Sequence, residues 1–81
     1  IKSFGETPDE LILEVADASL FLAGKYILGS TSLTLGVIAS VDGNNLKIIR
    51  PDALFTIGET VTVSGEAINS LVINQTETYY E

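Results

Sequence analysis

Histidine, cysteine, methionine and tryptophan are all absent from these 81 residues, and only four residues are basic. Without cysteine the chain cannot form a disulfide, and without histidine or cysteine a zinc site would rest on carboxylates alone, which is unusual. The same two absences remove the commonest general base and the thiol nucleophile of enzymes. We therefore expect no enzymatic activity, no metal site and no cofactor.

Basic residues are too few and too scattered to form a positive surface. Lys2, Lys25, Lys47 and Arg50 stand against 11 acidic residues, which gives a net charge of −7. A nucleic-acid partner requires a positive stripe that neutralises phosphates, and an anionic membrane surface has a similar requirement. The sequence also has no run of about 18 apolar residues, the length of a membrane-spanning helix. We expect neither a nucleic acid nor a membrane as partner.

Paired carboxylates are the one catalytic chemistry that the composition leaves open. The candidates are Asp9, Glu10, Asp42, Asp52 and Glu59. Each lies beside a glycine, a proline or a predicted turn, where acidic residues commonly cap and solubilise a chain. We therefore interpret them as structural.

The chain is short and rich in apolar residues. Its hydrophobic fraction is 46% and its mean hydropathy is +0.37. A domain of this size buries only about 60% of the surface that its unfolded chain exposes, so small domains often gain stability from partners. Part of the apolar surface is expected to contact a neighbouring molecule.

Short apolar runs separated by turn residues predict strands throughout the chain. The first run alternates Leu11, Leu13 and Val15, which favours a strand, although Thr7 and Glu10 would also fit the capping box of a helix. The other expected strands are Lys25 to Leu28, Leu33 to Val41, Leu46 to Ile49, Thr60 to Val63 and Ala67 to Ile73. The prediction is an all-β fold, a small antiparallel β-barrel or sandwich. Its parts are an N-terminal arm (residues 1–10), one β domain (11–74) and a polar C-terminal tail (75–81).

One hairpin turn is marked clearly by its residue types. Asp42, Gly43, Asn44 and Asn45 separate two apolar runs. Asp-Gly and Asn tolerate the positive φ angles of tight hairpin turns. We predict that this turn joins two antiparallel strands.

Residues 12–28 resemble residues 46–62 when the two are aligned without a gap. Phe21 then aligns with Phe55, and Gly24 aligns with Gly58. In each copy the phenylalanine is expected to fill a corner where the chain leaves the sheet, and the glycine to permit the backbone angle there. Both an internal duplication and the independent reuse of one type of corner account for the match.

The segment Phe21 to Leu28, preceded by Val15 to Ser19, resembles a small β module of tailed-phage virion proteins, and Val37 to Ile48 resembles the hairpin that follows it. Those modules occur in head-decorating, tail, baseplate and fibre proteins. The acidic residue that often follows the glycine is Lys25 in the first copy and Glu59 in the second, and an Arg-Gly element after the hairpin is missing. The resemblance implies a role in assembly and no catalytic site.

These observations lead to one functional expectation and one alternative. The expectation is a non-enzymatic structural module of a virion that decorates or stabilises a capsid or forms part of a tail. Its partners would be other virion proteins or copies of itself, a trimer by resemblance, bound through apolar faces and sheet edges. Phe4, Tyr79 and Tyr80 are the candidate interface residues. The alternative is a carbohydrate- or protein-binding β module of a larger secreted or surface protein, located outside the cell.

Overall fold

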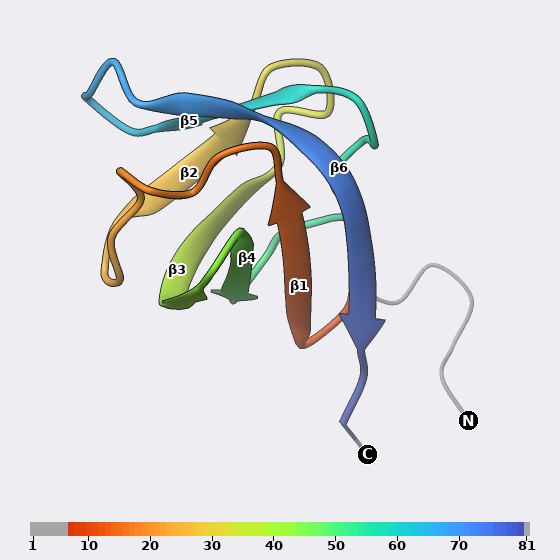
Figure 1. Cartoon of the computed structure of the whole chain (residues 1–81). Helices are drawn as coiled ribbons and strands as arrows, with labels where there is room; N and C mark the ends of the chain where they lie inside the picture. Colours follow the sequence, from red (N-terminus) through yellow and green to blue (C-terminus); the bar gives the residue numbers. More distant parts are fainter. Residues whose placement is uncertain (1–6, 81) are drawn as a thin grey trace.

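Six antiparallel strands make up the part of the chain that the computed structural model describes, residues 7–80 (Figure 1). No helix occurs in this range. The strands are β1 (Glu10–Val15), β2 (Tyr26–Gly29), β3 (Leu35–Asp42), β4 (Asn45–Ile49), β5 (Thr60–Val63) and β6 (Asn69–Thr78). The all-β prediction is therefore confirmed.

The strands close into a barrel rather than a sandwich. Their order around the barrel is β1-β4-β3-β2-β5-β6, and β6 pairs with β1 to complete the circle. Closure reduces the unpaired edge at which a partner could add a strand. Each described strand has a neighbour on both sides, but the second half of β6 pairs with β1 alone, so attachment through a sheet edge stays a prediction.

The core follows the alternation of apolar residues along the strands. In β1, Leu11, Leu13 and Val15 face the interior while Ile12 and Glu14 face outward, so this run is a strand and not a helix. Strand side chains alternate between the two faces of the wall, and in a small barrel the inner set fills the interior. The buried hydrophobic residues are Leu11, Leu13, Val15, Ala18, Phe21, Ile27, Ile38, Leu46, Ile48, Phe55, Val61, Val63 and Val72.

Strand β6 extends further than the sequence indicated. It runs to Thr78 and curves along the barrel from β5 to β1 (Figure 1). Its second half pairs with β1, with Leu13 opposite Gln75 and Glu10 opposite Thr78. The predicted polar tail (75–81) is therefore corrected over 75–78. The sequence did not indicate this half as a strand, because it has no large apolar residue and so shows no alternation of apolar and polar residues. Its pairing with β1 depends on residues far away in the sequence.

The two halves of the chain occupy equivalent places in the barrel. If β1 is exchanged with β4, β2 with β5 and β3 with β6, every strand keeps the same neighbours around the barrel. Hydrogen bonds recur at the same interval: Gly24 N–H donates to Ile38 O at 2.7 Å, and Gly58 N–H donates to Val72 O at 2.8 Å. The segments that resemble each other in sequence thus lead into the barrel in the same way.

The alignment of the two halves requires a shift by one position before the corners. Ile12 is 37% exposed whereas Leu46, its partner in the gapless alignment, is fully buried. Leu13 is the residue equivalent to Leu46, because the two pair across β1 and β4, and because Val15 pairs with Val72 as Ile48 pairs with Ile38. Matching residues of β1 and β4 are thus one position closer together in the sequence than matching residues from the corners onward.

Candidate functional site

The predicted corner residues close the barrel wall where the chain crosses from β1 to β2 and from β4 to β5. Phe21 and Phe55 are each only 3% exposed. Gly24 and Gly58 have φ angles of 90° and 93°, which a β-carbon disfavours. The buried phenylalanines fill the core, and the exposed glycines permit the backbone angle of the corner, so all four residues serve the fold.

The predicted hairpin turn joins β3 to β4. Asp42 pairs with Asn45, and Gly43 between them has a φ angle of 62°. Asn44 also has a role that the sequence did not indicate: its side-chain oxygen accepts a hydrogen bond from Ala18 N–H at 3.2 Å. The turn thereby ties the first corner to the end of the β3–β4 hairpin.

The C-terminal tyrosines lie beside acidic residues. Tyr80 is exposed, and its backbone N–H donates to the Asp9 carboxylate at 2.6 Å. A hydrogen bond to Glu10 raises the pKa of the Tyr80 hydroxyl. The Tyr79 hydroxyl donates to Glu77 at 2.8 Å. This end of the barrel is polar, and the third predicted interface residue, Phe4, lies outside the described residues.

Glu59 differs from the other candidate carboxylates because it is buried, with an exposed fraction of 4%. Its Oε1 atom accepts hydrogen bonds from the backbone N–H groups of Thr31 at 2.8 Å and Ser32 at 2.9 Å. Its Oε2 atom accepts from Ser32 Oγ at 2.7 Å and from Thr56 N–H at 2.6 Å. One side chain thus holds the loop after β2 against the corner before β5. We call this arrangement the Glu59 clasp.

The Glu59 clasp keeps its carboxylate ionised. Burial tends to raise the pKa of Glu59, but the hydrogen bonds from Ser32, Thr56 and Thr31 together lower it by more, so the net shift is downward. Both oxygens are already occupied by two donors each. The geometry is that of a structural anchor and does not suit a general base.

The equivalent place in the other half carries an ion pair, in which the basic residue follows the corner glycine and the acidic residue lies in the loop. Lys25 takes the position that Glu59 has in the second half, Glu66 takes the position that Ser32 has in the first, and the two pair at 3.1 Å. The sequence showed Glu59 as the acidic residue after a corner glycine. It could not show the clasp, because the loop that provides three of the donors is 27–28 residues away.

Apolar side chains cover the outside of β2 and β3. Tyr26 is 52% exposed, Leu28 is 42% exposed and Leu35 is 39% exposed. Tyr26 pairs with Val37 and Leu28 pairs with Leu35 across the two strands, so the four side chains lie next to one another on the outer wall. We call these four residues the β2–β3 apolar face. No sequence signal pointed to it, since strand residues on the inner and outer walls look alike when both are apolar.

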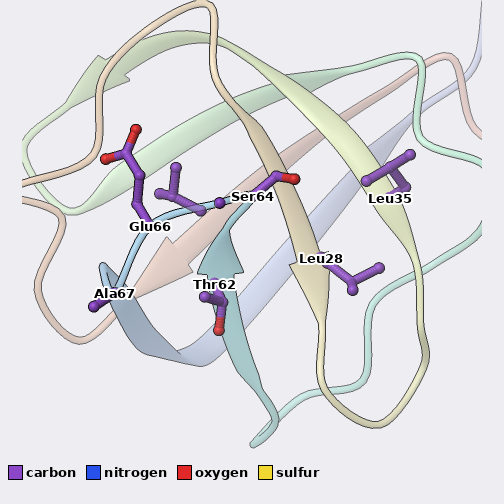
Figure 2. A pocket seen from close by; sticks show the side chains of 8 residues that line it. Leu28, Leu35, Thr62, Ser64, Glu66 and Ala67 are labelled. Carbon is purple, nitrogen blue, oxygen red and sulfur yellow. The ribbon is translucent and has the colours of Figure 1, made fainter.

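A groove runs along one side of this face. Figure 2 shows Leu28 and Leu35 beside it, with Thr62 of β5 next to Leu28, and the turn from Ser64 to Ala67 along the other side. Its volume is about 460 Å³. One lining side chain is charged, Glu66, and it is paired with Lys25. The groove suits apolar side chains better than a charged ligand.

Leu33 lies in the loop between β2 and β3 in an unfavourable conformation. Its φ angle is 60° and its exposed fraction is 67%. Leucine seldom adopts a positive φ, because its β-carbon crowds the backbone, and here no burial compensates for the strain. The Glu59 clasp fixes Thr31 and Ser32, the two residues immediately before it. The loop therefore presents Leu33 to solvent in a defined position.

Within residues 7–80, no group of three or more acidic side chains is placed to hold a metal ion. A helix long and apolar enough to cross a membrane does not occur in the same range. The chain matches no protein-family model, no curated protein and no solved structure.

Proposed function

We propose that this chain is a non-enzymatic structural module of a virus particle, which decorates or stabilises a capsid or forms part of a tail. The virion context rests on the resemblance of residues 15–28 and 37–48 to small β modules of tailed-phage proteins. The assembly role rests on the exterior of the barrel, where apolar side chains and a shallow groove lie together.

The observation that carries the proposal is the amount of apolar surface left outside a finished core. The large hydrophobic residues exposed in the described part of the chain are Ile12, Leu20, Leu22, Tyr26, Leu28, Leu33, Leu35, Leu54, Ile57, Leu71, Ile73 and Tyr80. They are nearly as numerous as the residues of the core. Exposed apolar residues are normal when single, but neighbouring ones mark contact surfaces. The β2–β3 apolar face brings three of them together beside Val37.

The carboxylates support a structural role more than a catalytic one. The buried Glu59 holds two segments of backbone together, and Asp42 lies at the exposed end of a hairpin. Asp52 accepts a hydrogen bond from Leu35 N–H at 3.0 Å. Acids that satisfy backbone donors in this way stabilise loops, and they are not paired across a cleft as in a hydrolase.

Electron microscopy and native mass spectrometry of the chain, isolated from its natural source, test the proposal. The expected result is a large particle that contains the chain in a fixed ratio to other structural proteins. A chain that is found only free, in no larger particle, would contradict it. Binding on a sugar array by that free chain would favour the carbohydrate-binding alternative, whose sugars stack on exposed aromatic residues such as Tyr26.

A further inference from the structure

We propose that the β2–β3 apolar face and Leu33 form the contact between two copies of this chain. The inference rests on the proposed function and deepens it, because it names the surface and the partner. Its first support comes from the internal symmetry of the barrel, which provides a comparison within one molecule.

Three of the four places in the apolar face carry polar residues in the second half of the chain. Their cross-strand pairings show which places match. The matching pairs are Tyr26 and Thr60, Leu28 and Thr62, and Leu35 and Asn69, while the fourth place is apolar in both halves, with Val37 matching Leu71. The fold therefore accepts threonine and asparagine at three of these places on its outer wall. The apolar residues of the first half need another reason, and a contact with a partner supplies one.

Leu33 supports the same conclusion through its backbone. The residue at the same interval in the second half is Ala67, which has no positive φ, and that loop takes its positive φ at Gly65 instead. The left-handed leucine is therefore particular to the first half. Asparagine or glycine would suit a φ angle of 60° better than leucine does. A strained, exposed leucine in a loop anchored by Glu59 has the features of a binding residue that is held ready before its partner arrives.

The charge distribution favours a second copy as the occupant. The four side chains of the face are uncharged, whereas the outer side of β1 carries Glu10, which pairs with Lys47 at 3.6 Å, and Glu14. A basic partner would be drawn to that acidic side. Two copies, each with a net charge of −7, approach with least repulsion through an uncharged face. At the edge of the groove the charge of Glu66 is offset by Lys25.

A stable contact between two copies requires a surface of a certain size. A standard interface removes about 800 Å² from each partner. That is roughly a sixth of the 4838 Å² of accessible surface of the chain. The β2–β3 apolar face would supply this area together with Leu33 and the adjoining groove.

Residue exchange between the halves tests the contact without disturbing the fold. The variant Tyr26→Thr/Leu28→Thr/Leu35→Asn carries at each place the residue that the barrel already holds in its other half. Sedimentation velocity across a range of protein concentrations should show an oligomer for the wild type and association weaker by about tenfold or more for the variant. The matched control is Ile12→Thr, which alters an exposed apolar residue on the outer side of β1 and should leave association unchanged.

Leu33→Asn separates a binding role from a structural one. Relief of the positive-φ strain should raise the melting temperature, while the loss of the exposed leucine should weaken association. A higher melting temperature with unchanged association would remove Leu33 from the contact. Added salt should strengthen self-association, because it screens the repulsion between two acidic molecules.

Two results would overturn the inference: a wild-type chain that stays monomeric at every concentration, or a triple variant that associates as the wild type does. The failure of this inference can be told apart from the failure of the proposed function on which it rests. A monomer that still occupies a virus particle would refute the self-contact and leave the structural role standing. An oligomer that is found in no virus particle would support the self-contact and refute the structural role in a virion.

Discussion

Replacement of Glu59 by glutamine tests whether the Glu59 clasp stabilises the barrel. Glutamine keeps the length and shape of the side chain but replaces one acceptor oxygen by an NH₂ donor. The amide oxygen can take the place of Oε1, which accepts from Thr31 and Ser32. The NH₂ group then lies where Oε2 was; the Ser32 hydroxyl can rotate to accept from it, but Thr56 N–H faces a second donor.

The expected loss in the free energy of unfolding follows from these four hydrogen bonds. A buried N–H group without an acceptor costs about 1–3 kcal/mol, and each remaining bond loses about 1 kcal/mol when its acceptor becomes neutral. The neutral amide regains part of this because it is less costly to bury than a carboxylate. We expect a net loss of about 2–4 kcal/mol. For a chain of 81 residues the whole stability is about 4–12 kcal/mol. The corresponding fall in melting temperature is roughly 8–30 °C.

The assay is thermal unfolding followed by circular dichroism over a range of pH. The folded-state pKa of Glu59 lies below its ordinary value of 4.5, so its stabilising contribution is complete above that pH and is lost as the pH falls through the folded-state pKa. Glu59→Gln lacks this contribution at every pH. The difference in melting temperature between wild type and variant should therefore be constant near neutrality and should narrow below pH 4.5.

Lys25→Gln is the matched control, since Lys25 holds the equivalent position in the first half of the chain. It breaks only a partly exposed ion pair with Glu66, for which we expect less than about 1 kcal/mol. If Glu59→Gln lowered the melting temperature no more than this control does, or if its effect did not depend on pH, the reasoning about the clasp would be refuted.

Three further substitutions probe other contacts by urea unfolding. Gly29→Ala would place a β-carbon 2.6 Å from the Oε1 atom of Glu59, so we expect a loss of about 2–3 kcal/mol that does not add to that of Glu59→Gln; full additivity would disprove the contact. Gln75→Glu removes the donor to Phe55 O and keeps the acceptor for Phe55 N–H. It should cost about 1–3 kcal/mol of unfolding free energy at neutral pH and less in acid, where the carboxyl regains a proton to donate. An equal loss at both pH values would contradict this role of Gln75. Gly58→Ala meets no atom within 4 Å, so its cost should be that of a φ angle of 93° alone, about 1–2 kcal/mol, and a neutral result would show that the backbone can relax.

Local sequence patterns were sufficient for most of the secondary structure. Alternation of Leu11, Leu13 and Val15 indicated β1, and the Asp42 to Asn45 turn indicated the β3–β4 hairpin. Both depend on neighbouring residues: a period of two on one strand, and residue types that tolerate a positive φ. The absence of histidine and cysteine limited the possible chemistry in the same direct way.

The tertiary structure alone decided the closure of the barrel, the polar half of β6 and the role of Glu59. Each depends on hydrogen bonds between residues distant in the sequence, such as β6 with β1 or Glu59 with the loop after β2. The β2–β3 apolar face belongs to this group, since an apolar strand residue reads the same whether it faces the core or the solvent. Only the three-dimensional register shows that Tyr26, Leu28 and Leu35 lie outside while Thr60, Thr62 and Asn69 take the matching places. Periodicity thus determined which segments are strands, and pairing across the barrel determined which side chains are free to meet a partner.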